Sequence, residues 1–237
     1  AKGNVIRRLD EESVRKALKQ AKNDGINGVA IAFMHSYMNS DHEEKIAQIA
    51  IEEKFLQVSV SHQVSPLMKL VGRGDTTVVD AYLSPILRRY VDQVSSELIN
   101  SKSTKLMFMQ SNGGLTDAKL FQGKDALLSG PAGGVVSMVQ TGIQAGFKKL
   151  IGFDMGGTST YVCHFSGEYE RSFETEVAGV RIRAPMMQIH TVAAGGGSIL
   201  SFKDGRFQVG PESAGASPGP ASYGKGGPLT VTDLSLI

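Results

Sequence analysis

The chain has 237 residues, of which 41% are hydrophobic and 20% charged, and 25 Lys and Arg against 23 Asp and Glu give a formal net charge of +2. This composition is typical of a folded globular protein of one large or two small domains and excludes an intrinsically disordered chain. The charge is nearly balanced and no stretch is dense in Lys or Arg, so no nucleic-acid partner is expected.

Other features of the sequence predict a cytoplasmic protein without a membrane partner. The longest apolar runs, such as Gly28 to Met34, are far shorter than the roughly 20 residues that span a bilayer, and the first residues do not open a signal peptide. The single Cys163 excludes an internal disulfide and a zinc site built on thiolates. Glycine is over-represented, mostly in the second half.

The first quarter of the chain alternates helix and strand. Asp10 is expected to cap a helix, because apolar residues follow it at helical spacing and Gly25 stands where a helix ends. Asp41 is expected to cap the next helix, with Glu44 in the capping-box position. The pattern predicts an α/β architecture with parallel strands: helices over 10–22 and from 41, and strands over 28–34 and 57–62.

The middle of the chain is expected to be mainly helical. A long pattern over 76–99 has apolar residues at helical spacing, and Pro85 either starts a new helix or kinks the existing one. A strand over 106–109 runs into the glycine-containing loop 111–114. The glycine-rich segment 129–134 is expected to lead into a helix over 135–145, where it either allows close packing or leaves the helix N-terminus open to an anion.

The last third is expected to consist of strands, turns and irregular chain. In order, we expect a strand over 150–153, a hairpin of 161–165 with 169–177, and a hairpin that turns at Asp204-Gly205. The first hairpin would turn at Ser166-Gly167. The run 210–228 is so rich in Gly, Pro, Ser and Ala that no regular structure is expected there.

The segment from Ile151 to Thr160 is the most informative one chemically. A predicted apolar strand ends close to a carboxylate, and two glycines and three hydroxyl residues follow shortly after it in the sequence. Glycines let backbone N–H groups approach an oxyanion closely, hydroxyls add donors, and an Asp at a strand end can hold Mg²⁺ through water. A plain hairpin turn with a hydroxyl cluster is the alternative. The residues concerned are Asp154, Gly156, Gly157, Thr158, Ser159 and Thr160.

A second glycine group stands between short apolar runs. Gly195, Gly196 and Gly197 are consecutive, and such a run is costly unless a backbone or a ligand passes close to it. A structural turn is the alternative. The fingerprints of a Rossmann dinucleotide site and of a P-loop do not occur in the sequence, so those two readings lose their main support.

The ordered set of motifs closely resembles the hydantoinase A/5-oxoprolinase family over essentially the whole chain. The family resembles a branch of the actin-like ATPase superfamily, whose two ribonuclease H-like lobes clamp ATP between them. The resemblance implies an α/β fold with a mixed sheet flanked by helices. It rests on Phe153–Thr160, Ser129–Val136, Ser111–Gly114 and Ala193–Ser198, extended by Val209–Ala216, Pro218–Pro220, Gly226–Asp233, His35–Tyr37, His42–Glu43 and Asp80–Leu83.

The resemblance also implies that the chain is partial. Residues 1–130 match the remainder of the N-terminal half, whose first phosphate loop, an Asp-x-Gly-Gly-Thr segment, is missing. Residues 131–237 match the second lobe, with its phosphate loop at 154–160 and a truncated C-terminus. Such a fragment is expected to turn over little or nothing alone, because the opposite lobe is required to close around the phosphates.

The activity implied by the resemblance is ATP-dependent hydrolysis of a cyclic amide. Members of the family open 5-oxoproline or hydantoins, and the resemblance suggests that the γ-phosphoryl group passes to a carbonyl oxygen. Their partner is a hydantoinase B-type subunit or domain. The alternatives are a non-catalytic nucleotide-binding or subunit-interaction module, and a subunit of a ketone carboxylase.

The resemblance assigns roles to the motif residues, with ATP and Mg²⁺ as cofactors. Asp154 and Thr158 are expected to be catalytic, and Asp154 is also the expected metal ligand. The remaining expected contacts are Gly156, Gly157, Ser159, Thr160, Gly195, Gly196, Gly197 and Ser198 for ATP, and Ser111, Asn112, Gly113, Gly114 and His190 for the substrate.

One residue departs from the family pattern beside the phosphate loop. The family continues Thr-Ser-Thr with Asp, and this chain has Tyr161 there. The change removes a candidate anchor for a metal or water, so either ATP handling is altered or the carboxylate is not essential. The five histidines share no metal-ligand spacing and are interpreted as surface or hydrogen-bonded residues, with His190 as the exception because it precedes the glycine run.

Overall fold

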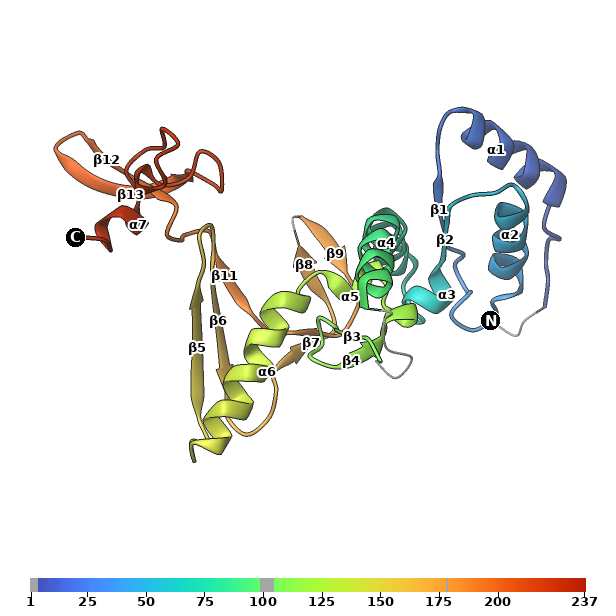
Figure 1. Ribbon diagram of the computed structural model, residues 1–237. Coiled ribbons are helices and arrows are strands. Elements are labelled where there is room, and N and C mark those ends of the chain that lie inside the picture. Colours follow the sequence, from blue (N-terminus) through green and yellow to red (C-terminus); the bar gives the residue numbers. More distant parts are fainter. Residues whose placement is uncertain (1–3, 99–104, 178) are drawn as a thin grey trace. The chain divides into compact units, whose positions relative to one another are not determined.

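The computed structural model describes residues 4–98, 105–177 and 179–237 (Figure 1). The chain forms two compact units. The first contains Ala1–Ala132 and Arg171–Met187, and the second contains Gly133–Glu170 and Gln188–Ile237. The units therefore part close to residue 130, but the segment 171–187 folds with the first unit. That these units are the two lobes of an ATPase stays a prediction.

The first unit begins with the expected α/β layer. Helix α1 (Glu11–Asn23) is capped by Asp10, whose side chain accepts a hydrogen bond from Ser13 N. Strands β1 (Gly28–Ile31) and β2 (Gln57–Val60) pair in parallel, as predicted. A small core of Ile31, Ile46 and Val60 lies between the strands and α2 (Asp41–Glu52).

The start of α2 differs by one residue from the prediction. Ser40 is the N-cap residue and donates through Oγ to Glu44 Oε1 at 2.5 Å, so Asp41 is not the cap. Asp41 lies instead in the first turn, where a negative charge is stabilised by the helix dipole.

Helix α4 (Leu70–Leu98) is longer than the predicted helix 76–99 and passes through Pro85 without ending. It follows a short helix, α3 (Ser61–Val64), and packs on β1, β2 and β9. Its early start includes the buried Gly72 and Arg73, whose carbonyls accept hydrogen bonds from the hydroxyls of Thr76 and Thr77. Tertiary packing overrides the local penalty of the proline here.

The rest of the first unit consists of short elements around α4. One core cluster joins Val91 to Ala118 and Phe121, and another joins Ile182, Ala184 and Met186. The elements are β3 (Met107–Met109), β4 (Leu115–Asp117), η1 (Ala118–Leu120), α5 (Gly123–Ala126), β7 (Arg171–Ser172), β8 (Thr175–Val177), β9 (Val180–Ile182) and β10 (Met186–Met187).

The predicted hairpin of 161–165 with 169–177 is wrong. Beyond an isolated bridge between Phe165 and Tyr169, β7 pairs with β10 and β8 pairs with β9. The turn signal at Ser166-Gly167 is real, since Gly167 has φ +101°, but the chain then leaves for the first unit. Strand pairing is decided by distant partners, which a local turn signal does not reveal.

The second unit is built on the antiparallel sheet β11-β6-β5, formed by β5 (Leu150–Met155), β6 (Thr160–Phe165) and β11 (His190–Val192). Helix α6 (Ser129–Gln144) lies along β5 and β6 (Figure 1). The approach is close, because a Cβ on Gly152 would lie 2.5 Å from Cys163 Sγ and 2.6 Å from Met138 Sδ. Since α6 begins at Ser129, residues 129–134 are its first turns and not a loop before it; Pro131 is compatible with that position.

A second hairpin completes this unit. Strands β12 (Ser198–Lys203) and β13 (Arg206–Ser213) turn at Asp204 and Gly205, as predicted, and both turn residues have positive φ, 53° and 75°. The expectation of no regular structure over 210–228 is wrong in two places. β13 continues to Ser213 because it stays paired with β12, and η2 spans Ala221–Tyr223. The last element is α7 (Val231–Leu234). Within the described residues, no helix combines the length and apolar character needed to cross a bilayer.

Candidate functional site

The loop between β5 and β6 carries the residues that sequence analysis singled out. Asp154 is near the end of β5, and Gly156 to Ser159 form the turn, which Gly156 N closes by donating to Ser159 O at 2.9 Å. Asp154, Gly156, Gly157 and Thr158 are all exposed. The segment is thus the tip of a tight hairpin whose polar atoms are accessible.

The second glycine group packs directly on this tip. Gly196 N donates to Gly156 O at 2.9 Å, and Gly197 N donates to Gly157 O at 2.7 Å. A Cβ on Gly195 would lie 2.6 Å from Gly156 O, and main-chain atoms cannot move aside as a flexible side chain does. The three consecutive glycines are therefore explained by a backbone that passes close to them.

Two of the predicted hydroxyls join the same loops. Thr160 Oγ1 donates to Ala194 O at 2.7 Å, and Gly195 N donates to Ser198 Oγ at 3.1 Å. Both side chains are buried. These contacts hold the loops together, while the predicted contacts of Thr160 and Ser198 with ATP stay predictions.

A third segment, near the end of the chain, supports the glycine run from the other side. Thr232 N donates to Gly196 O and Ala214 N to Gly197 O, both at 2.8 Å. The side chain of Asp233 accepts hydrogen bonds from Ser222 N at 2.8 Å and Thr230 N at 2.7 Å. Burial raises the pKa of Asp233, but these bonds outweigh it and hold the pKa far below its usual range.

Sequence analysis used Thr230 to Asp233 as a family motif and missed this supporting role. The signal was present, because a hydroxyl residue followed three positions later by a carboxylate is the spacing of a capping box. The structure shows that box at the start of α7.

The tip of the β5–β6 hairpin keeps three main-chain donors free. Among the residues that the structure describes, the N–H groups of Gly157, Thr158 and Ser159 have no hydrogen-bond partner. Successive unpaired N–H groups at a turn form a concave donor set that binds anions, phosphates above all. The side chain of Asp154 likewise has no hydrogen-bond or ion-pair partner in the described part of the chain.

Tyr161 stands directly opposite Asp154 in the β5–β6 register. Opposed residues of an antiparallel pair project from the same face of the sheet, with Cβ atoms about 4.5–5.5 Å apart. The phenol therefore lies next to Asp154 on one face of the sheet.

A magnesium site at this position would depend on a single carboxylate. Over the described ranges there is no group of three or more His, Cys, Asp or Glu side chains able to hold a metal ion. Mg²⁺ is commonly bound by one or two carboxylates together with the phosphates of its substrate and water. The accessible Asp154 beside free N–H donors fits that mode, in which the nucleotide completes the coordination.

The predicted substrate residues Ser111 to Gly114 belong to the first unit, whereas the tip belongs to the second. Ser111 is buried in the first unit, where its Oγ donates to Asp125 O at 2.7 Å and accepts from Leu128 N at 2.9 Å. Asn112 Oδ1 accepts from Gly114 N at 2.7 Å, and Gly113 has φ +81°, so the loop is a tight turn between β3 and β4.

His190 belongs to the second unit but faces away from Asp154. It is exposed and lies opposite Val162, whereas its neighbour Thr191 lies opposite Tyr161. Since side chains alternate along a strand, His190 projects from the sheet face opposite to that of Asp154 and Tyr161. The assignment of Ser111, Asn112, Gly113, Gly114 and His190 to the substrate stays a prediction.

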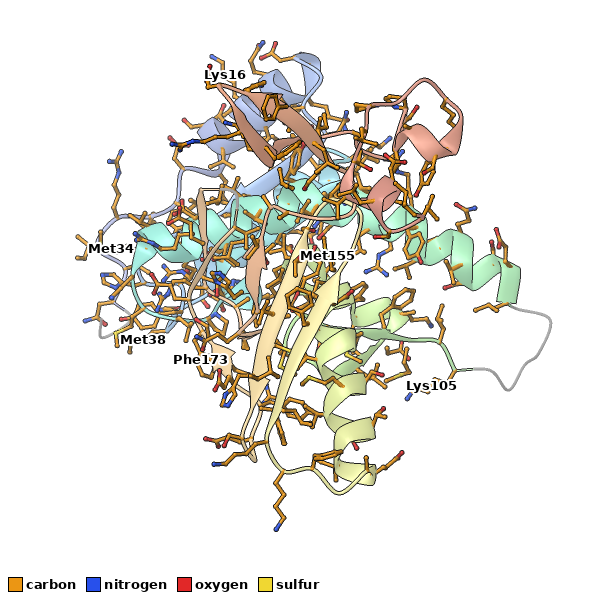
Figure 2. All side chains as sticks on the ribbon, turned by 90° about the vertical axis from the view of Figure 1, so that its left-hand side faces the viewer. Lys16, Met34, Met38, Lys105, Met155 and Phe173 are labelled. Carbon is orange, nitrogen blue, oxygen red and sulfur yellow. The ribbon has the colours of Figure 1, made fainter. Side chains whose placement is uncertain are left out.

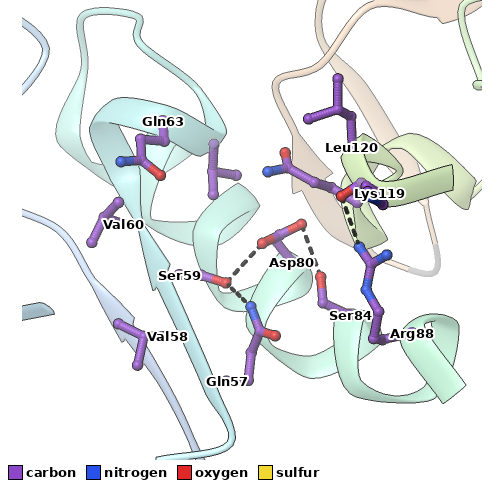
Figure 3. Close-up of a pocket in the computed structure, with 12 residues that line it drawn as sticks. Gln57, Val58, Ser59, Val60, Gln63, Asp80, Ser84, Arg88, Lys119 and Leu120 are labelled. Atoms are coloured by element: carbon purple, nitrogen blue, oxygen red, sulfur yellow. Dashed lines mark hydrogen bonds between the residues drawn. The ribbon is translucent and has the colours of Figure 1, made fainter. Parts of the chain in front are cut away.

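A separate polar cavity of about 170 Å³ lies in the first unit between β2, α4 and the η1–α5 segment (Figure 3). Asp80 Oδ2 accepts from Ser59 Oγ at 2.7 Å, and Asp80 Oδ1 accepts from Ser84 Oγ at 3.2 Å. Arg88 on the same wall donates to Ala118 O at 2.9 Å. These charged groups are thus engaged in joining the elements around the cavity.

Comparison with known proteins identifies relatives over the whole chain. The Hydantoinase/oxoprolinase family model matches residues 73–237, and the model of the Hydantoinase/oxoprolinase N-terminal region matches residues 1–54. The chain is 50% identical to 5-oxoprolinase of Saccharomyces cerevisiae over 98% of this chain and 18% of that protein. It is 46% identical to 5-oxoprolinase 1 of Arabidopsis thaliana, over 98% of this chain and 19% of that protein.

Solved structures give the same result. Acetone carboxylase in its nucleotide-free form superposes with a TM-score of 0.77 at 26% identity, over 89% of this chain and 31% of that one. The ATP-dependent caprolactamase of Pseudomonas jessenii superposes with a TM-score of 0.78 at 36% identity, over 100% of this chain and 35% of that one. The expected α/β fold is thereby confirmed.

Nearly all of this chain is matched in these comparisons, but only a small part of each 5-oxoprolinase is. The chain spans about a fifth of the length of the 5-oxoprolinases that it matches, whose covered share is 18% and 19%. The family model nevertheless matches residues 73–237, which is more than half of the chain. The chain belongs to the hydantoinase/oxoprolinase family.

Proposed function

We propose that the chain is the phosphate-binding part of an ATP-dependent hydrolase that opens a cyclic amide such as 5-oxoproline or a hydantoin. The observation that carries the proposal is the set of three free N–H groups of Gly157, Thr158 and Ser159 beside the accessible carboxylate of Asp154. Relatives named 5-oxoprolinase and caprolactamase support the substrate class.

The main chemical task of this site would be to neutralise the negative charge of the phosphates. ATP, when bound, would supply the γ-phosphoryl group to the amide carbonyl oxygen, with release of ADP, and so activate the carbonyl carbon for attack by water and cleavage of the ring C–N bond; Mg²⁺ would shield the phosphate charge. The N–H groups of Gly157 to Ser159 would donate to phosphate oxygens, and Asp154 would hold the metal. Phosphoryl transfer needs such positioning and electrostatic stabilisation more than it needs covalent chemistry by the protein.

The packing of the glycine loops is what makes these donors effective. The carbonyls of Gly156 and Gly157 accept hydrogen bonds from the N–H groups of Gly196 and Gly197, so these bonds fix the position of the hairpin tip. A donor set that is already in place does not have to be reorganised during the reaction. Thr158 is exposed at the same tip and its hydroxyl adds a further donor.

Tyr161 favours a second candidate, a nucleotide-binding module without catalysis. Its ring stands opposite Asp154, where a second carboxylate would contribute to metal binding. In that case ATP would bind without being hydrolysed in response to a cyclic amide.

We further propose that the protein works with a second subunit or domain of the hydantoinase B type. One relative, 37% identical over 99% of this chain, is named caprolactamase subunit alpha, and its name implies at least one other subunit. The share of that relative covered here is 35%.

The test of the proposed function uses the complete gene product together with its partner. ADP release is measured with Mg-ATP in the presence and absence of 5-oxoproline, hydantoin and caprolactam. Release that depends on a cyclic amide supports the hydrolase, and tight ATP binding without such release supports the module.

Asp154→Asn tests the metal-binding carboxylate within the same assay. We expect kcat to fall about a hundredfold to a thousandfold, the usual effect of removing one charge-stabilising group. Asp204→Asn is the matched control, because it makes the same chemical change at the exposed turn of the other hairpin. Equal effects of the two substitutions would contradict the role of Asp154.

A further inference from the structure

The motif residues around His35 to Glu43 have no role in the phosphate site, and in the structure they border a large pocket. Residues 33–42 follow the end of β1 and, together with Asn4 to Arg7, line a cavity of about 760 Å³ in the first unit. Ligands of α/β proteins bind preferentially outside the carboxyl ends of parallel strands, which is where this loop begins. The volume lies in the range of small-molecule sites.

A fully buried carboxylate holds the loop that lines the pocket. Glu43 has 0% exposure and accepts hydrogen bonds from Phe33 N at 2.8 Å, Ser61 Oγ at 2.5 Å and His62 N at 2.9 Å. Burial raises the pKa of Glu43, but hydrogen bonds from Ser36, Ser61 and His62 outweigh it and lower the pKa below its ordinary value. The carboxylate is therefore charged and fixes the start of the loop.

A fully buried guanidinium holds the same loop from the other side. Arg73, also with 0% exposure, donates through Nη2 to Phe33 O and Met34 O, and through Nε to Ser61 Oγ at 2.9 Å. Ser61 is thus the shared link between the guanidinium and the carboxylate. Buried charges are costly to desolvate, and here three main-chain groups of one loop, Phe33 N, Phe33 O and Met34 O, are among their hydrogen-bond partners. The arrangement gives residues 33 and 34 a single defined backbone position.

The walls of the pocket combine apolar and polar groups. Met34 and Met38 are each 62% exposed, and Figure 2 shows both side chains projecting from the same side of the first unit. The ring of His42 stands edge-on to that of Phe33, with centroids 6.1 Å apart. The polar side chains of the lining that have no hydrogen-bond partner among the described residues are Asn4, Arg7, His35, Asn39, Asp41 and His42.

We propose that this pocket binds the cyclic-amide substrate, and that it is built for a ring amide carrying a carboxylate. Arg7 would pair with the carboxylate, since a guanidinium is suited to that geometry. Asp41 would accept from the ring N–H, and His42 would donate to the ring carbonyl. The ring methylenes would lie against Met34 and Met38, whose flexible thioether side chains adapt to such shapes. The inference rests on the proposed function and names the site where its substrate binds.

Within this proposal, Arg73 and Glu43 are positioning residues. They do not line the pocket, but their hydrogen bonds place the loop that presents Met34 and His35. Disturbing them should weaken substrate binding through the loop, without a direct contact to the ligand.

The binding test uses the complete protein and three ring compounds. 5-Oxoproline carries both the amide and the carboxylate, 2-pyrrolidinone lacks the carboxylate, and proline lacks the amide carbonyl. We expect 5-oxoproline to bind most tightly by calorimetric titration. Arg7→Gln should weaken its binding at least tenfold and leave that of 2-pyrrolidinone unchanged. Arg8→Gln is the matched control, because Arg8 is the exposed neighbouring arginine and does not line the pocket.

Steady-state kinetics separate this pocket from the nucleotide site. Arg7→Gln and Met38→Glu should each raise KM for 5-oxoproline at least tenfold and leave KM for ATP unchanged. A rise in KM for ATP instead would show that the pocket holds the nucleotide and would overturn the proposal. Both variants change exposed side chains, so loss of folding is not expected to obscure the result.

The positioning role of Arg73 is tested with Arg73→Lys. Lysine keeps the charge but loses the planar fork that reaches three carbonyls, of Phe33, Met34 and Leu67, and Ser61 Oγ. We expect a raised KM for 5-oxoproline at unchanged KM for ATP. A fall in thermal stability with both KM values unchanged would show that Arg73 is only structural.

Failure of the inference differs from failure of the proposed function. If the wild-type protein opens cyclic amides but the Arg7 and Met38 variants behave as wild type, the pocket assignment is wrong and the function stands. If the wild-type protein opens no cyclic amide, the proposed function is wrong, and the titration then decides the pocket. If 5-oxoproline binds and the binding depends on Arg7, the pocket assignment stands. If 5-oxoproline does not bind, the pocket assignment is wrong.

Discussion

At the scale of single residues, Asp154 and Tyr161 set the charge next to the proposed phosphate site. They are opposed in the β5–β6 register and share one face of the sheet, so a carboxylate at position 161 would stand next to the existing one. The chain has instead a half-buried phenol at this position.

Tyr161→Asp should therefore strengthen metal binding. We expect the Mg²⁺ concentration that gives half the maximal ATPase rate to fall by about tenfold, the lower end of what supporting groups contribute to metal affinity. The measurement is a magnesium titration of the complete enzyme at saturating ATP. Tyr161→Asn is the control for size without charge, and an equal shift in that variant would contradict the electrostatic explanation.

Asp233 makes a pH-dependent contribution to stability. Its hydrogen bonds to Ser222 and Thr230 outweigh the effect of burial and depress its pKa in the folded state. A depressed pKa stabilises the fold fully above the ordinary value of 3.8, and this stabilisation is lost as the pH falls from there through the folded value.

Asp233→Asn should consequently destabilise the protein at neutral pH and less so in acid. The free energy of unfolding, measured by urea titration at pH 6 and pH 3, should differ more between wild type and variant at the higher pH. The exposed Asp204→Asn should show no such difference. A gap between wild type and Asp233→Asn that is independent of pH would mean that the charge of Asp233 is not what matters.

At the scale of elements, the contact between the two glycine loops is the feature most sensitive to side-chain size. A Cβ on Gly195 would lie 2.6 Å from Gly156 O and 2.7 Å from Gly157 C, and both are main-chain atoms. The collision can be relieved only by separating the loops, which would break the hydrogen bonds from Gly196 and Gly197.

Gly195→Ala should destabilise the second unit by about 1–3 kcal/mol, the usual range for overpacking. Gly134→Ala is the matched control, because Gly134 lies within α6 and nothing is within 4 Å of its would-be Cβ. In a helix the exchange of Gly for Ala stabilises by up to about 1 kcal/mol. Thermal unfolding should separate the two variants in opposite directions, and similar melting temperatures would show that the loops tolerate separation.

The elements themselves were predictable where local signals decide them. The cap of α1 at Asp10 and the β12–β13 turn at Asp204-Gly205 depend on neighbours within a few residues. The start of α6 at Ser129 was not predicted, because the glycines of its first turns suggested a loop. The length of α4 was underestimated for a related reason, since its first turn is held by the buried Arg73, whose partners lie up to forty residues away.

At the scale of the whole molecule, the chain order of the motifs predicted the family and the α/β fold. The division of the chain into two units was harder to predict from the sequence. The segment 171–187 interrupts the second unit in sequence and folds with the first, where Ser65 Oγ donates to Arg183 O across 118 positions. No local sequence pattern predicts a contact between residues so far apart in the chain.

The proposed phosphate site also had features that the sequence predicted and features that only the structure revealed. Asp154 and the glycines after it were recognisable from residue types alone, because few chemistries require a carboxylate, two residues without Cβ and three hydroxyls in one run. That Gly195 to Gly197 would lie on this run, and that Thr232 would support them, follows from the tertiary structure only.

The amino-acid sequence by itself determined the cap of α1, the β12–β13 turn and the residues of the hairpin tip, because these depend on propensities and spacings within a few positions. The parallel pairing of β1 and β2 followed from the alternation of helices and strands. Only the tertiary structure decided which strands pair beyond β6, which glycines meet, and that Glu43 and Arg73 share a buried network beneath a pocket. Those outcomes depend on burial and on hydrogen bonds between groups far apart in the chain, and such terms act only once the fold has brought the groups together.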